Sequence, residues 1–163
     1  SNSESVTGQR PDSEMSDVVI NDLCRKLLHS MADDSKDGVE TRYTTNVPDD
    51  FTVRTHPSTM NRILTHLYGN AQKFTEKGHI ELRCEQDKAA HLIRLTMEDT
   101  GVGIKPEDRD RIFDLFEKAA DNFKEGIGLG LPICRRLASS IGGEINLDPD
   151  YTDGCRFVLS IPV

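Results

Sequence analysis

Residues 57–77 have the spacing of a long helix that is buried along one side. The apolar side chains that recur at helical intervals are Met60, Ile63, Leu64, Leu67, Ala71 and Phe74. A second stripe with the same spacing is polar and consists of Arg62, His66, Asn70 and Lys73. Gly78 follows and predicts the end of the helix. The chain must therefore bury one stripe of this helix in a core and place histidine, asparagine and lysine beside it.

Segments that alternate apolar and polar residues surround this helix and predict strands. The clearest pair, 79–86 and 91–99, predicts an antiparallel hairpin. The other expected strands are 39–47 and 51–55, joined by a turn at 48–50, and 143–150 and 155–163, which form a hairpin around 151–154.

Helical patterns are interleaved with these strands. One helix begins at Ser16 or Asp17 as N-cap and ends at 35–38, and another runs from the glycine-rich segment 126–131 to about Ile141. A short helix is expected at 107–116. Together the patterns predict an α+β fold, an α/β sandwich in which one mixed, mostly antiparallel sheet is covered on one face by about three helices.

The length of 163 residues suits one domain, which we place at 14–163. Residues 1–13 are polar and aperiodic, so we expect a disordered linker or a remnant of expression. The formal net charge of −8 argues against a surface for nucleic acid or for an anionic membrane. A phosphate ligand would need a local basic pocket.

The four cysteines are far apart in the sequence, which fits free thiols in a reducing compartment better than disulfides or a zinc site. We see neither a membrane-spanning apolar run nor a signal peptide. The expectation is a cytoplasmic chain, which can still be a piece of a protein anchored in the inner membrane.

Two glycine-rich segments are candidates for binding. Residues 99–104, DTGVGI, follow a strand and fit either a plain turn or a contact for a flat ligand, because aspartate accepts a hydrogen bond from an exocyclic amine. Residues 126–131, GIGLGL, open a helix with Pro132 in its first turn. A helix start binds anions through its free N–H groups, although a flexible hinge has the same composition.

Asn70 and Lys73 carry the groups that a nucleoside triphosphate would still require. The amide oxygen of Asn70 is a hard ligand of the kind that Mg²⁺ accepts, and Lys73 offers a cation to phosphate. Taken singly, an asparagine and a lysine beside a buried stripe are more often solvated surface residues. Their meaning depends on the segments that accompany them.

Those segments follow one another in a distinctive order. NAQKFT lies on a helix, and a strand pair, DTGVGI, FDLF, a polar segment and GIGLGL come after it. This order resembles the catalytic and ATP-binding domain of sensor histidine kinases, within the Bergerat-fold (GHKL) ATPases. The resemblance extends from about Met15 to the C-terminus, and it implies a Bergerat-type sandwich with ATP and Mg²⁺ as ligands.

By this resemblance Asn70 coordinates Mg²⁺, Lys73 reaches the phosphates, and Phe74 packs beside adenine, although Phe74 equally fits a plain core position. Asp99 binds the adenine amino group. The nucleotide-binding residues that the resemblance implies are Asn70, Lys73, Phe74, Asp99, Gly101, Gly103, Ile104, Lys118, Gly126, Gly128, Leu129 and Gly130.

Two positions depart from the family pattern. His66 stands where the family usually has an asparagine, and it is either a phosphate contact or a harmless surface substitution. Ile127 stands where many relatives carry threonine. No residue is assigned as a firm catalytic group, because the general base is commonly beside the acceptor histidine.

The implied function is that of the catalytic half of a two-component sensor histidine kinase. It would transfer the γ-phosphoryl group of Mg-ATP to a histidine on a separate dimerisation domain, because none of the five histidines lies in an acceptor-type segment. The expected partners are that dimerisation (histidine-phosphotransfer) domain and, downstream, a response-regulator receiver domain. The fragment itself is expected to be monomeric, with no nucleic-acid or direct membrane contact.

Three alternatives are weighed against this function. A pseudokinase that binds nucleotide or a partner without transfer is kept open by His66 and Ile127. A serine kinase of the anti-sigma type is disfavoured by the FDLF segment and the GLGL ending. A chaperone- or topoisomerase-type ATPase is disfavoured because 58–70 contains no acidic residue.

Overall fold

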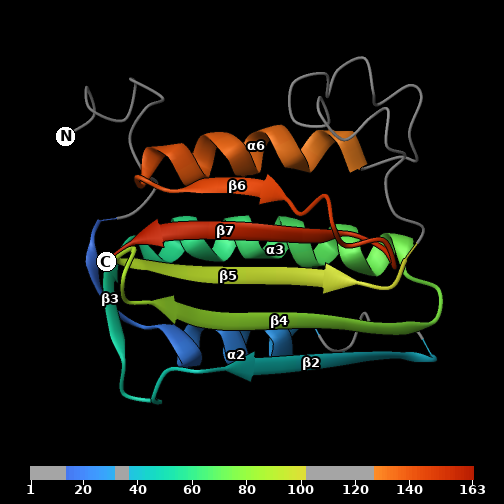
Figure 1. Ribbon diagram of the computed structural model, residues 1–163, viewed down its shortest axis with the longest axis horizontal. Coiled ribbons are helices and arrows are strands. Elements are labelled where there is room, and N and C mark those ends of the chain that lie inside the picture. Colours follow the sequence, from blue (N-terminus) through green and yellow to red (C-terminus); the bar gives the residue numbers. More distant parts are fainter. Residues whose placement is uncertain (1–13, 32–36, 102–126) are drawn as a thin grey trace.

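A mixed five-stranded sheet forms the centre of the fold (Figure 1). The computed structural model of the chain describes residues 14–31, 37–101 and 127–163. In spatial order the strands are β2 (Val39–Thr45), β4 (Gly78–Asp87), β5 (Leu92–Asp99), β7 (Arg156–Pro162) and β6 (Glu144–Leu147). β2 runs parallel to β4, and the other neighbouring pairs are antiparallel. The predicted mixed, mostly antiparallel sheet is confirmed.

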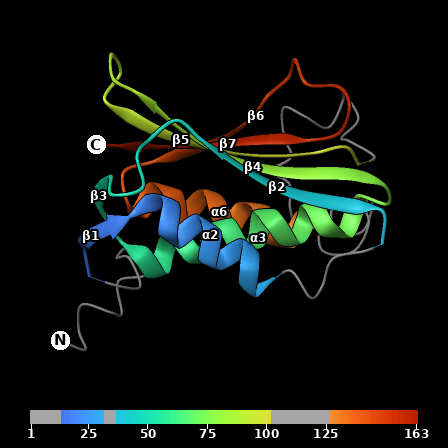
Figure 2. The ribbon, with the colours of Figure 1, turned by 90° about the horizontal axis from the view of Figure 1, so that it is seen from below.

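Three helices lie against one face of this sheet, so that sheet and helices form two layers (Figure 2). They are α2 (Ile20–Ser30), α3 (Pro57–Phe74) and α6 (Ile127–Ser140). The apolar stripe of α3 is buried as predicted, and the alternate β4 residues Ile80, Leu82 and Cys84 are buried in the same core. The largest fully buried side chains between the layers are Ile20, Met60, Ile63, Leu64, Leu67, Tyr68, Ile80, Leu82, Ile93, Leu95 and Leu131. The predicted sandwich and its covered face are thus confirmed.

The N-terminal segment differs from the prediction. Ser16 does not cap a helix, because β1 (Ser16–Val19) is a strand that pairs antiparallel with β3 (Thr52–Thr55) in a separate two-stranded sheet. Val18 is 7% exposed and Val19 is 37% exposed, which is the alternation of a strand. Its partner strand β3 lies far along the sequence, so the local residue pattern could not predict that 16–19 forms a strand.

The turn at 48–50 joins two different sheets. Both strands predicted around it exist, but β2 belongs to the large sheet and β3 to the small one. Buried Asn21 fastens the turn, since its Nδ2 donates to the backbone oxygen of Val47 at 3.0 Å and to Oδ1 of Asp49 at 3.0 Å. Tyr43 donates its hydroxyl to Oδ1 of Asn21 at 2.6 Å.

α3 ends at Phe74, earlier than the predicted Lys77. Gly78 therefore does not stop the helix. It begins β4 with φ +114°, and a Cβ there would collide with the hydroxyl of Thr100. Thr100 in turn accepts a hydrogen bond from the backbone N–H of His79 at 3.0 Å. Glycine is required at this point because the strand begins against the end of β5.

The four cysteines, Cys24, Cys84, Cys134 and Cys155, are buried and free, so the prediction of free thiols is confirmed. Within the described ranges, no helix combines the length and the apolar composition that a membrane crossing needs.

Candidate functional site

A hollow lies between the helix layer and the sheet, where α3 and β5 both end. Its volume in this structure is about 20 Å³, so a flat ring enters only when the lining moves. α3, β5, α6 and the start of β7 supply the lining, which consists of Leu67, Asn70, Ala71, Phe74, Met97, Asp99, Leu131, Cys155 and Phe157. The walls are apolar except for one amide and one carboxylate. Such a pocket suits a flat apolar ligand that carries a few polar groups.

Asp99 is the carboxylate of this hollow, and only 6% of it is exposed. Its Oδ1 accepts hydrogen bonds from the backbone N–H groups of Gly101 at 2.7 Å and of Cys155 at 3.3 Å. In the described part of the chain no lysine or arginine forms an ion pair with it, and Oδ2 receives no hydrogen bond. Burial raises the pKa of Asp99, and the two backbone hydrogen bonds offset this only in part. Oδ2 of Asp99 can therefore accept a hydrogen bond from a ligand.

Two glycines allow the backbone to close around this carboxylate. A Cβ on Gly101 would collide with the backbone oxygen of Phe74, and one on Gly154 would collide with the backbone oxygen of Asp99. Any larger residue would push apart the ends of α3, β5 and β7. For Gly101 this gives a structural reason for the glycine that the motif predicted.

Asn70 brings the amide into the same hollow. Its Nδ2 is buried and has no hydrogen-bond partner among the residues that the structure describes. An unpaired buried N–H costs free energy, so a ligand that accepts a hydrogen bond there would be favoured. The amide oxygen of Asn70 is a hard ligand atom, and Mg²⁺ accepts a single protein oxygen when phosphate and water complete its shell. Asn70 therefore fits the predicted metal ligand, which stays a prediction.

The other predicted site residues of α3 differ in whether they line the hollow. Phe74 is 7% exposed and lines it, so it serves as core residue and pocket wall together. Lys73 is exposed and does not line the hollow. His66 is half-buried one helical turn before Asn70, and burial, followed by the charge of Arg62, lowers its pKa. The structure brings Asn70, Phe74, Asp99 and Gly101 together and leaves Lys73 and His66 beside them.

Several predicted site residues lie outside the described residues. These are Gly103, Ile104, Lys118 and Gly126. For Gly128, Leu129 and Gly130 the backbone is described, and it forms the first turn of α6. The prediction that Pro132 lies in the first turn of this helix is wrong, since the glycine-rich segment is itself helical from Ile127 and Pro132 is inside the helix. The proposed contacts of these glycines with phosphate stay predictions.

Residues between Tyr151 and Phe157 complete the site, and the sequence patterns did not single them out. Cys155 and Phe157 line the hollow, and Tyr151 donates its hydroxyl to the backbone oxygen of Asp99 at 2.8 Å. They reach the site because β7 pairs with β5 along its whole length. The one local signal was Gly154, directly before a strand.

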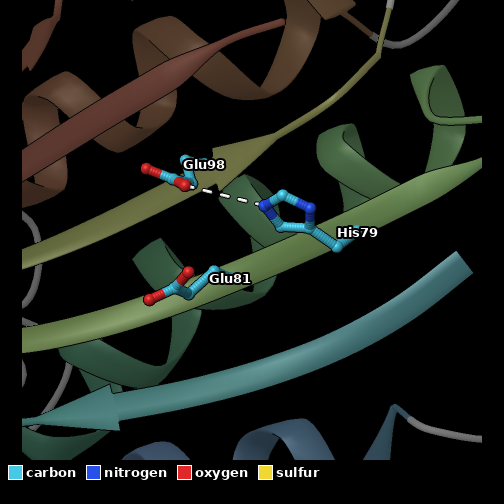
Figure 3. A group of neighbouring side chains, drawn as sticks. All are labelled: His79, Glu81 and Glu98. Atoms are coloured by element: carbon cyan, nitrogen blue, oxygen red, sulfur yellow. Dashed lines mark ion pairs between the residues drawn. The ribbon is translucent and has the colours of Figure 1, made fainter. Parts of the chain in front are cut away.

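A second cluster of titratable groups lies on the opposite face of the sheet, where His79, Glu81 and Glu98 approach one another (Figure 3). Oε1 of Glu98 accepts from Arg156 at 2.8 Å and from Arg83 at 3.2 Å. A divalent cation would have to displace these guanidinium groups. We therefore assign the cluster to the stability of the sheet and not to a metal centre.

Comparison with known proteins adds a family. The protein family described as histidine kinase-, DNA gyrase B-, and HSP90-like ATPase matches residues 55–163 of the chain. The sensor histidine kinase AruS of Pseudomonas aeruginosa is 37% identical over 108 residues, which make up 63% of this chain and 11% of AruS. The sensor protein SrrB of Staphylococcus aureus is 35% identical over 107 residues, or 63% of this chain and 18% of SrrB. The chain thus spans only a small part of the length of these relatives.

Solved structures are similar over nearly the whole chain. The catalytic domain of the histidine kinase ThkA superposes with a TM-score of 0.79 at 25% identity, covering 91% of this chain and 95% of that domain. Full-length ShkA, solved in complex with AMPPNP, superposes with a TM-score of 0.77 at 28% identity, covering 93% of this chain and 31% of ShkA.

Proposed function

The chain belongs to the family of histidine kinase-, DNA gyrase B-, and HSP90-like ATPases, and we propose that it binds ATP and donates the γ-phosphoryl group as the catalytic domain of a sensor histidine kinase. The observation that carries this proposal is the hollow, where a buried carboxylate and a buried amide N–H line the same space, the first without a cation and the second without an acceptor among the described residues. The AMPPNP complex of ShkA, which has the same fold, supports the choice of nucleotide.

Asp99 would select the base. Its Oδ1 is occupied by two backbone N–H groups, so Oδ2 is the oxygen that can accept from the amino group of adenine. Phe74, Met97 and Leu131 would enclose the ring. Desolvation by these apolar walls strengthens a hydrogen bond to the carboxylate.

Asn70 and Lys73 would act at the phosphate end. A Mg²⁺ ion, when bound, neutralises charge on the phosphate oxygens, and Asn70 is the described residue that would hold it. Lys73, one turn further along the exposed side of α3, would add a cation for the phosphates. Phosphoryl transfer needs little covalent chemistry from the protein, so these groups would act by position and charge.

The acceptor would come from another domain. In the transfer, the bond between the γ-phosphorus and ADP breaks as a bond to an imidazole nitrogen of the acceptor forms. We propose the dimerisation domain of the same kinase as acceptor and a response-regulator receiver domain as the next recipient. The names of AruS and SrrB support a sensor kinase as the parent protein.

The first test is a calorimetric titration of the chain with ATP, with and without Mg²⁺. We expect binding in both cases and a tighter constant with Mg²⁺. Asn70→Ala should reduce the increase in ATP affinity caused by Mg²⁺ by about tenfold, because the metal loses one protein ligand. ATP affinity without metal should be nearly unchanged. Asn146→Ala, on the exposed edge strand β6, is the matched control.

Transfer is then followed as acid-labile phosphate on an added dimerisation domain. No binding of ATP by the unchanged chain would contradict the proposed function. Binding without transfer to the cognate domain would identify a pseudokinase.

A further inference from the structure

Tyr151 makes a single hydrogen bond to the residue that would recognise the base. It lies in the connection between β6 and β7, and its hydroxyl donates to the backbone oxygen of Asp99 at 2.8 Å. Burial, followed by the charges of Glu98 and Asp99, raises the pKa of Tyr151 to about 12. The hydroxyl therefore stays a donor across the physiological range.

The ring of Tyr151 is held in place from its other side. The guanidinium carbon of Arg156 stands 4.2 Å from the ring centroid, which is the geometry of a cation–π contact. Arg156 is itself fixed by Glu98 at 2.8 Å and by Asp148 at 3.1 Å. The ring thus lies against a cation that cannot leave without breaking two ion pairs.

The hydrogen bond from Tyr151 acts on the orientation of the Asp99 side chain. The peptide group that carries the backbone oxygen of Asp99 joins it to Thr100, and the next peptide group carries the N–H of Gly101, which donates to Oδ1 at 2.7 Å. Rotation of the first of these peptide groups would carry the N–H of Gly101 away from Oδ1. Gly154 packs against the same oxygen from the β7 side. Tyr151 therefore locks the backbone that orients the carboxylate.

We propose that Tyr151, stacked under Arg156, is a positioning residue that fixes Asp99 in the orientation that discriminates adenine from other purines. The inference rests on the proposed function, because it concerns the precision with which the same carboxylate meets the base. Tyr151 does not line the hollow, so it would act on the base through Asp99. Its effect is confined to the edge of the purine that Asp99 would bind.

The test compares ATP with ITP, which carries an oxygen in place of the 6-amino group. Tyr151→Phe removes the hydroxyl and keeps the ring. We expect the ratio of ATP affinity to ITP affinity to fall about 5- to 10-fold, the size of one lost hydrogen bond, with affinity for inorganic tripolyphosphate unchanged. Arg156→Lys keeps the positive charge but loses the planar guanidinium group that stacks on Tyr151 and bonds to two carboxylates. It should lower the ratio of ATP affinity to ITP affinity by a smaller factor.

Tyr43→Phe is the matched control, since it removes a hydroxyl that bonds to Asn21 and lies outside the hollow. It should leave the ratio unchanged. Thermal unfolding of each variant shows that it is folded. An unchanged ratio in Tyr151→Phe, in a chain that binds ATP, overturns the positioning role and leaves the proposed function intact. Failure of the unchanged chain to bind ATP overturns both.

Discussion

Glu98 and Asp99 are consecutive residues of β5, and each is 6% exposed, yet they are buried for opposite purposes. Glu98 faces the sheet surface away from the helices. Burial would raise its pKa, but the hydrogen bonds and charges of Arg156 and Arg83 outweigh it and lower the pKa. Asp99 faces the hollow, its donors among the described residues are two backbone N–H groups, and burial raises its pKa.

The difference separates a structural carboxylate from one available to a ligand. Glu98 has its counter-charges within the fold, so it needs nothing further. Asp99 carries a cost of burial that its two backbone hydrogen bonds offset only in part, and one of its oxygens has no donor among the described residues. A ligand that donates a hydrogen bond there gains more than it would from an exposed carboxylate. Exposure alone would not have told the two residues apart.

The largest effect is expected from Asp99→Asn. The backbone N–H groups of Gly101 and Cys155 require an acceptor, so the amide nitrogen would face the hollow and meet the 6-amino group of adenine donor to donor. ATP affinity should fall on the order of 100-fold, and ITP should bind better than ATP. Calorimetry with both nucleotides measures this. Glu98→Gln, on the other face, reaches Asp99 only through Arg156 and Tyr151 and should lower ATP affinity far less, so an equal loss in both variants would contradict the contrast.

The next effect concerns stability. Glu98→Gln leaves Arg83 and Arg156 without their shared carboxylate and should lower the free energy of unfolding by about 2 kcal/mol. Asp99→Asn removes a buried charge that has no ion pair among the described residues, and it should not destabilise the fold. Urea unfolding of both variants gives the comparison, with Glu144→Gln on the exposed edge strand β6 as control. Equal destabilisation by the first two substitutions would argue against the distinction.

The smallest expected effect is on the pH dependence of unfolding. The pKa of Glu98 is lower in the folded protein than in the unfolded chain. Its charge therefore contributes fully to the free energy of unfolding at pH values above the unfolded-state pKa, and this contribution is lost as the pH falls through the folded-state pKa. Since the folded pKa of Asp99 is raised, its cost diminishes as the pH falls through that value.

Acidification should therefore destabilise Glu98→Gln less steeply than the unchanged protein, and Asp99→Asn more steeply, by about 1 kcal/mol in each case. Thermal unfolding between neutral pH and about pH 3 measures both slopes. Parallel slopes in the two variants would show that the two carboxylates titrate alike.

The sequence predicted those parts of the molecule that depend on local spacing. The stripe of α3, the β4–β5 hairpin and the β6–β7 hairpin all follow from period alone. β1 could not be foreseen, because pairing with β3 overrides the local preference of four residues. The end of α3 at Phe74 was likewise set by contact with the neighbouring strands and not by Gly78.

The site divides in the same way. Asn70 and Asp99, which the structure places in the same hollow, could be predicted because each lies in a short motif and the order of these motifs along the chain carried the resemblance. Tyr151 and Cys155 were missed because they reach Asp99 through the pairing of β5 with β7. Nothing near Tyr151 in the sequence states which residue its hydroxyl will meet. The ionic partners of Glu98 were missed for the same reason.

The bond between the N–H of Cys155 and Oδ1 of Asp99 joins residues 56 positions apart. Closing a loop of that length costs more entropy than closing the β4–β5 hairpin, so we expect this contact to form after the hairpin. A chain in which β7 has not yet docked would hold Asp99 by one N–H group instead of two, with no Tyr151 against its carbonyl. Nucleotide would thus bind the completed protein and not its folding intermediates, and added ATP would slow unfolding while leaving the early steps of folding untouched.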